Sequence, residues 1–469
     1  MTLISYKFIG NKMKLTGFVT KMVLFFILTF GLSGIGIADS VDIADTGMLT
    51  VDPKNHIVGE MDIGAMDATD KRVQMPIGEF LSTAFEDPSL SPQNERIRFL
   101  EETFGGISFI EDPEFRVSID KFESNQQKYA LRFKPRGWNE IKGEKAVQHA
   151  RVQSGAIQLK SLMHLALKNR YMSVVDFLYF SEMRTLHESL NLLYKDWEHV
   201  LKRHVHTAEF DAGALADMEN QQMALQMDLM DIKTQQDAVA EEVNLQSGYG
   251  TNIFFNGDHL LSVDELADRI LAIHINAGDE NIYLIQAKTE VAKSDAQYRL
   301  EVAEKNRLIS FVETAYNTAD EDDFEDAFSI EFGISIPIGS GGRDTLRQRK
   351  LETMKSRSEH QALEREIKQT IPVIQKKLHH LIKQYTAVQQ KKANSFSTAA
   401  FDRLLQTEGT DPLTLLKLKK GMIGMDILQS KLSRRIFTTY IDFLDITGKL
   451  SEKPLMNYLS SDDEEGLVQ

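Results

Sequence analysis

The stretch FSIEFGISIPIG at residues 328–339 alternates large apolar residues with small or polar ones. An alternation with period two is typical of a β-strand whose two faces meet different surroundings. About 9–11 residues are enough for a tilted strand to cross a membrane. We therefore expect a strand over 328–338 whose apolar side faces lipid. The expected lipid-facing residues are Phe328, Ile330, Phe332, Ile334 and Ile336.

Three more segments alternate in the same way and complete two hairpins. Residues 307–316 precede the quoted strand across an acidic connection, and residues 114–122 and 128–135 are joined by the link ESNQQ. Both hairpins are followed by proline, glycine and a charged helix, which indicates an internal repeat. A soluble sandwich is the alternative, although four strands are few for one. The expected lipid-facing residues of the first hairpin are Phe115, Val117, Ile119, Tyr129, Leu131 and Phe133, and the turns after the hairpins hold Pro135, Gly137, Pro337, Gly341 and Gly342.

Each hairpin leads into long helices in which apolar residues repeat in heptads, the pattern of a left-handed supercoil. Pro372 lies inside one of these runs, where it should kink or start the helix. Met223, Met227 and Met230 are interpreted as core filler. The heptad positions are Leu186, Leu190, Leu193, Trp197 and Val200, then Met218, Leu225, Leu229 and Ile232, and finally Ile371, Ile374, Leu378, Leu381, Tyr385 and Val388.

Two glycines interrupt the helical regions and predict tight turns between antiparallel helices. These are Gly213 in the first copy and Gly409 in the second. We expect the turns to form the exposed tips of the helices, together with Asp217, Glu408 and Asp411. Before the second hairpin, Ser262 and Glu265 predict a capping box at the start of a helix over 262–306.

The N-terminus has the pattern of an export signal. Lys7, Lys12, Lys14 and Lys21 precede an apolar stretch over 22–38, and the small residues Gly36 and Ala38 form a cleavage site before Asp39. A retained N-terminal anchor is the alternative, and Met13 is an alternative start. Loss of the four lysines would take the net charge from -15 to -19.

Composition excludes several classes of function. The 469-residue chain carries a net charge of -15, which argues against nucleic acid as a partner because phosphate binding needs a basic surface. It contains no cysteine, which excludes disulfides, thiolate metal sites, cysteine nucleophiles and an acylated N-terminal cysteine. His204 and His206 point to different helix faces, and His379 and His380 are adjacent, so we expect no metal site. No catalytic constellation or phosphate-binding loop is present, and we expect no enzyme and no cofactor.

Residues 110–448 resemble the TolC-type outer-membrane efflux proteins. FSIEFGISIPIGSGGRDTLRQRKLE resembles that family's second transmembrane strand, its Gly-Gly-Arg turn ending at Arg343, and the start of its long helix. KRHVHTAEFDAGALADMENQQMALQ resembles the first apex turn, and LLQTEGTDPLTLLKLKKGMIGMDILQSKLSRRIFTTYIDFLDITG the second apex turn and last helix. LADRILAIHINAGDENIYLIQAKTEVAKSDAQYRLEVAEKNRL resembles the helix before the second hairpin.

The resemblance implies a mixed membrane α/β fold in a homotrimer. Long antiparallel coiled-coil helices would form an α-barrel across the periplasm, and four transmembrane β-strands per chain would share a 12-stranded β-barrel in the outer membrane. The partners would be a periplasmic adaptor and a proton-driven or ABC-type inner-membrane pump, for small-molecule efflux or for polypeptide secretion. A periplasmic coiled-coil scaffold that is not a channel is the rival interpretation.

The implied organisation is a signal peptide 1–38, an N-terminal segment with a short first helix 39–110, repeat 1 over 111–250 with its hairpin at 114–135, repeat 2 over 251–448 with its hairpin at 307–338, and an acidic tail 449–469. Two features depart from the family pattern. The helix before the first hairpin is short, and the positions of the family's aspartate ring hold Leu415 and Leu418, or Thr414 and Lys417. An acidic gate is therefore not predicted.

Overall fold

The computed structural model describes residues 73–102, 108–119, 127–203, 212–248, 252–257, 260–273, 281–317, 328–335, 343–395, 412–451 and 456–460. The chain divides into the units Met1–Ala68 and Thr69–Gln469, and the first lies wholly outside the described residues. The signal peptide falls there. The predictions for Ile336, Pro337, Gly341, Gly342, Glu408, Gly409 and Asp411 also lie outside the described residues.

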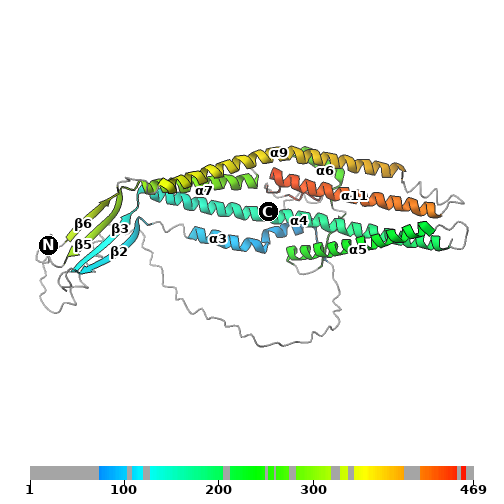
Figure 1. Cartoon of the computed structure of the whole chain (residues 1–469), viewed down its shortest axis with the longest axis horizontal. Coiled ribbons are helices and arrows are strands. Elements are labelled where there is room, and N and C mark those ends of the chain that lie inside the picture. Colours follow the sequence, from blue (N-terminus) through cyan, green and yellow to red (C-terminus); the bar gives the residue numbers. More distant parts are fainter. Residues whose placement is uncertain are drawn as a thin grey trace, which may run out of the picture. The chain divides into compact units, whose positions relative to one another are not determined.

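Long helices make up most of the described chain (Figure 1). The N-terminal segment holds α2 (Ile77–Ser82), the 3-10 turns η1 (Thr83–Glu86) and η2 (Pro88–Leu90), and α3 (Ser91–Glu102). The first repeat continues with α4 (Trp138–Arg203) and α5 (Ala212–Ser247). The second contains α6 (Val263–Ala272), α7 (Ile282–Lys305), α9 (Arg343–Ser395) and α11 (Pro412–Thr447), followed by η6 (Lys449–Ser451).

The helices of the two halves pack in the same way, with two shorter helices along one long helix in each half. α3 and α5 both lie along α4, and α7 and α11 both lie along α9 (Figure 1). The halves join because α4 also contacts α7 and α11. α3 has 12 residues and α7 has 24, so the described helix before the first hairpin is half as long as the one before the second.

The heptad positions supply the core. Ile371, Leu378 and Leu381 are buried, and Ile374, Tyr385 and Val388 pack against the same cluster. Leu193 of α4 is buried. Leu190 and Trp197 of the same helix pack against a cluster that includes Met218 and Leu225 of α5. These heptad positions therefore lie on the helix faces that pack against neighbouring helices, as predicted.

The structure decides three details of the predicted helices. α9 continues through Pro372, so the alternative in which this proline starts the helix is wrong. The expected helix 262–306 is broken, because Ile273 is extended and the Asn281 side chain starts α7 by accepting from Tyr283 and Leu284 N–H groups. The capping box of Ser262 and Glu265 is confirmed.

The three methionines of α5 are not core residues. Met223, Met227 and Met230 leave 62–69% of their surface exposed. α5 faces α4 with Met218 and Leu225, which are two turns apart, and the three methionines occupy other sides of the helix. A heptad identifies one buried seam and cannot assign the apolar residues beside it.

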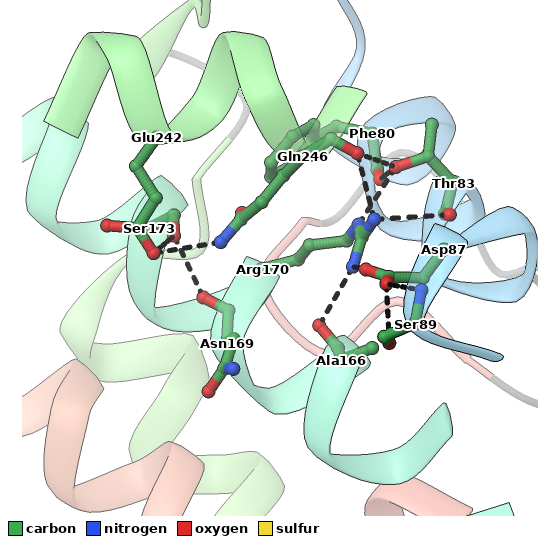
Figure 2. A network of polar contacts seen from close by, with 10 residues as sticks. All are labelled: Phe80, Thr83, Asp87, Ser89, Ala166, Asn169, Arg170, Ser173, Glu242 and Gln246. Atoms are coloured by element: carbon green, nitrogen blue, oxygen red, sulfur yellow. Dashed lines mark hydrogen bonds and ion pairs between the residues drawn. The ribbon is translucent and has the colours of Figure 1, made fainter. Parts of the chain in front are cut away.

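A buried arginine fixes the N-terminal segment to the helices (Figure 2). Arg170 of α4 is 1% exposed and donates to Thr83 Oγ1 at 2.9 Å, Asp87 Oδ2 at 3.0 Å and the Gln246 carbonyl at 2.8 Å. Burial acts to raise the pKa of Asp87, but hydrogen bonds from Ser89 and Arg170 outweigh it and hold that pKa below its ordinary value. The contacts of Arg170 therefore tie the segment that contains η1 and η2 to α4 and to the end of α5.

A second buried network joins α4, α7 and α11 around Asp445. Its Oδ1 lies 2.6 Å from His164 Nε2 and accepts from the Tyr283 hydroxyl at 2.9 Å, and its Oδ2 accepts from Lys168 at 2.6 Å. Burial acts to raise the pKa of Asp445, yet the hydrogen bonds from His164 and Lys168 lower it below its ordinary value. Burial acts to lower the pKa of Lys168, but hydrogen bonds to Asp445 and Asp442 and the charges of these carboxylates outweigh it. The pKa of Lys168 therefore lies above its ordinary value.

The chain after Thr447 is not tail-like in its described part. Leu450 and Leu459 are buried, and Leu261 N–H donates to the Leu459 carbonyl at 2.8 Å. Tyr171 donates to the Met456 carbonyl at 2.9 Å. Within the predicted acidic tail 449–469, Leu450 and Leu459 therefore belong to the core, and Tyr458 packs against it.

Candidate membrane-spanning sheet and its junction with the helices

Four strands form an antiparallel sheet in the order β2-β3-β5-β6. They are β2 (Ile110–Ile119), β3 (Gln127–Pro135), β5 (Ile309–Asn317) and β6 (Phe328–Ile334). Figure 1 shows this sheet where the helices α4, α7 and α9 meet the strands. A separate parallel pair joins β1 (Val73–Gln74) to β4 (Ile253–Phe254). The two hairpins lie side by side through β3 and β5, and β2 and β6 are the edges of the sheet.

The register shows that the predicted apolar residues share one face. Residues directly opposite each other on neighbouring strands point to the same side. Phe115 faces Leu131, Leu131 faces Thr314, and Thr314 faces Ile330 across the four strands. The next row is Val117, Tyr129, Tyr316 and Phe328. Phe115 and Phe332 leave 61% and 63% of their surface exposed, so this face is apolar and open to the surroundings.

Phe133 is an exception among the predicted lipid-facing residues. It pairs with Val312 on the apolar face, but it is only 5% exposed and is covered by other residues of the chain. We exclude it from the candidate lipid-facing set. The strand alternation places a residue on a face and does not show what else covers that face.

The opposite face carries charges that the sequence alone did not connect. Glu114, Arg132, Glu313 and Glu331 follow one another in a single row across the four strands. The guanidinium of Arg132 lies 3.7 Å from the centre of the Phe311 ring, a cation–π contact. A Cβ at Gly333 would overlap that ring, so glycine makes room for the stack.

Two β-bulges lie at the end of the sheet nearest the helices. The register shifts between Glu111 and Glu114 in β2, where Asp112 has a φ of 48°, and between Ile309 and Phe311 in β5. An extra residue reverses the faces of all residues beyond it. Ile309 therefore faces Ile334 and stays on the apolar side.

An ion cluster joins both hairpins to the first long helix. Arg307, before β5, binds buried Glu140 of α4 through Nε and Nη2, with a shortest distance of 2.6 Å. It also lies 2.8 Å from Glu111 of β2, and Arg136 pairs with Glu144 at 2.5 Å. Hydrogen bonds to Glu140 and Glu111 raise the pKa of Arg307 above its ordinary value despite burial.

The strand–helix turn residues lie close to their predicted places. Pro135 is the last residue of β3, Gly137 immediately precedes α4, and Arg343 is the first residue of α9. β6 ends at Ile334, before the predicted end of that strand, although Ser335 N–H still donates to the Leu308 carbonyl at 2.8 Å.

The apex turn predicted near Gly213 stays a prediction, because residues 204–211 lie outside the described residues. That glycine is the second residue of α5, which begins at Ala212, and Asp217 is exposed on the same helix. α4 ends at Arg203 and α5 begins at Ala212. In the sequence, a glycine at the start of a helix interrupts the helical pattern in the same way as a glycine in the turn between two helices.

Among the described residues, no group of histidines and acids is arranged to hold a metal ion. None of the described helices combines the length and hydrophobicity that a membrane span requires.

Comparisons with known proteins give matches only among solved structures. No protein-family model matches the sequence, and no curated protein matches it. The chain is similar to CusC, whose structures concern folding and transmembrane channel formation, with 12% identity, a TM-score of 0.60, and coverage of 79% of this chain and 92% of that one.

Two further structures match over the same share of the chain. The outer membrane protein VceC of Vibrio cholerae has 10% identity and a TM-score of 0.59, over 79% of this chain and 96% of that one. The open MtrE outer membrane channel of Neisseria gonorrhoeae has 9% identity and a TM-score of 0.59, over 79% and 88%. Similarities at this level of identity establish the fold of the chain.

Proposed function

Because the chain has the fold of the TolC-type outer-membrane channels, we propose that it is one subunit of such a channel. Three copies would share a 12-stranded barrel in the outer membrane, and their helices would enclose a tunnel across the periplasm. The channel would conduct a substrate across the membrane without converting it chemically.

The observation that carries this proposal is a sheet with two different faces and two free edges. In lipid, every backbone donor and acceptor needs a partner, so strands cross membranes only as closed barrels. About eight strands are the smallest barrel. Four strands per chain cannot close one, and we propose three copies, as in the family that the sequence resembles.

The dimensions of the sheet agree with a membrane. β2 has 10 residues. Nine steps of about 3.4 Å make roughly 31 Å, and a tilt of about 40° leaves about 23 Å across the membrane. The apolar band of outer-membrane barrels is about 25 Å tall.

The partners follow from the same arrangement. We propose that a periplasmic adaptor docks at the helix tips near Asp217 and that an inner-membrane pump supplies the substrate. We favour small-molecule efflux by a proton-driven pump, with polypeptide secretion by an ABC-type pump as the other version. Deleting the neighbouring pump genes one at a time and measuring resistance to toxic compounds and secreted protein separates the two.

Membrane fractionation tests the channel against the scaffold interpretation. We expect the protein to stay with outer membranes in carbonate and high salt, to be released by detergent, and to run as a heat-sensitive trimer. Complete release by carbonate as a monomer would show a peripheral scaffold and reject the channel.

A further inference from the structure

The first two turns of α4 present one aromatic and two basic side chains to the surroundings. Trp138, the first residue of α4, leaves 76% of its surface exposed, and Lys142 and Lys145 are also exposed. The spacing of four and then three residues places all three on one stripe of the helix. This stripe begins three residues after Pro135, where the apolar sheet ends.

The opposite side of the same turns is covered. Glu140 and Val147 are buried there, and a Cβ at Gly143 would lie 3.1 Å from the Leu300 backbone of α7. The charged residues on that side are paired, as in the Arg307–Glu140 contact. Lys142 and Lys145, by contrast, have no ion pair or hydrogen bond with any described residue.

The heights of these residues match the headgroup layer of a bilayer. Headgroups add roughly 5–8 Å to each side of the hydrocarbon core. At about 1.5 Å per residue, Lys142 lies about 6 Å and Lys145 about 10 Å along the helix from Trp138. A lysine side chain is long enough to reach back toward the interface. His149, a turn further, lies about 16 Å from Trp138 and outside that layer.

We propose that Trp138, Lys142 and Lys145 form an interfacial anchor that binds the headgroups of anionic phospholipids in the periplasmic leaflet. The indole ring occupies the boundary between acyl chains and headgroups, where tryptophan is enriched. The two ammonium groups bind lipid phosphates, which the many carboxylates of this acidic chain would repel. The proposal rests on the channel function, because it requires the neighbouring sheet to cross a membrane.

The two tryptophans of the chain make a direct test possible. The full-length protein is reconstituted into phosphatidylcholine vesicles that carry bromine at a shallow or a deep acyl position. The variant Trp197→Phe retains only Trp138, and we expect stronger quenching by the shallow bromine. Trp138→Phe retains only Trp197, about 88 Å away along α4, and should not be quenched.

A third probe reports whether the sheet is in the membrane at all. Phe332→Trp in the Trp138→Phe/Trp197→Phe background places one tryptophan on the exposed apolar face. We expect strong quenching of this probe by the deep bromine. If this probe is quenched and Trp138 is not, the anchor is rejected and the channel proposal stands. If no probe is quenched, both are rejected.

The lysines are tested by lipid preference. Vesicles contain a minor fraction of brominated lipid, either phosphatidylglycerol or phosphatidylcholine, in the same unbrominated background. We expect phosphatidylglycerol to be enriched near Trp138 by up to about fivefold per lysine, and the excess to shrink at high salt.

The double variant Lys142→Gln/Lys145→Gln should abolish this enrichment, whereas Lys160→Gln/Lys195→Gln should retain it. The control pair is exposed on the same helix, removes the same charge and lies farther along α4. Equal quenching by the two brominated lipids in the otherwise unchanged Trp197→Phe protein would overturn the anionic headgroup as the ligand.

Discussion

An arginine at Ile330 should disrupt the assembled protein, and an arginine at the next residue should not. Ile330 lies in the middle row of the apolar face, with two rows toward the strand ends on either side. Ser329 faces Ala315 on the polar side of the same strand and is also exposed. The two substitutions add the same side chain one residue apart, on opposite faces of the sheet.

The magnitude follows from the depth of the site. An arginine on the lipid side at the midplane of a barrel costs about 2–4 kcal/mol. Three copies would lose roughly 6–12 kcal/mol per trimer, which is comparable to the whole stability of many proteins. On the polar face the guanidinium stays in water and the cost should be near zero.

The assay is urea unfolding of protein reconstituted in vesicles, together with the yield of heat-sensitive trimer from outer membranes. Ile330→Arg should lower the unfolding midpoint and the trimer yield, and Ser329→Arg should match the unsubstituted protein. Ile330→Val controls for loss of packing alone. Equal midpoints for the two arginine variants would refute the assignment of the faces.

Four further outcomes are expected. Arg307→Gln should cost about 3 kcal/mol in urea unfolding because it leaves Glu140 buried and unpaired, whereas Arg299→Gln, which removes an exposed ion pair with Asp295, should cost under about 1 kcal/mol; similar costs would show that the ion cluster around Arg307 contributes little. Gly333→Ala should cost about 1–3 kcal/mol by crowding Phe311, and Gly424→Ala, with open space around it, should not. The lowered pKa of Asp445 means that its ionised form stabilises the fold above about pH 4 and that this contribution is lost as the pH falls through the folded pKa, so Asp445→Asn should be less stable than the parent at pH 7 and the difference should shrink as the pH falls below about 4. Glu313→Gln/Glu331→Gln should reduce cation selectivity in single-channel recordings mainly at low salt, and unchanged selectivity at both salts would place any charge filter elsewhere.

Strand faces and helix seams could be predicted from the sequence because both are local periodic patterns. Alternation at Phe328, Ile330 and Phe332 needs no knowledge of the rest of the chain, and neither does the heptad through Leu378 and Leu381. The capping box of Ser262 is local as well. Each depends on residues within a few positions of one another.

The features that escaped prediction depend on distant pairs or on one extra residue. Arg307 and Glu140 are 167 positions apart, and neither lies in a recognisable motif. The bulge at Asp112 shifts the faces of β2 by an insertion that alternation alone does not reveal. The burial of Phe133 and the exposure of Met223 also escaped prediction. A periodic pattern indicates the face on which a side chain lies, but it does not show which other residues cover that face.

The free edges of the sheet decide what kind of contact can join two copies. In the proposed ring, β6 of one chain would meet β2 of the next, and the interface would be heterologous, with a different surface on each side. Heterologous contacts produce a closed ring when the rotation between copies divides a full turn, and an open, growing ribbon when it does not. The bulges in β2 and β5 bend and twist the strands, and they thereby contribute to that rotation. On this account, straightening a bulge would alter the number of copies in the ring before it altered the fold of any single chain.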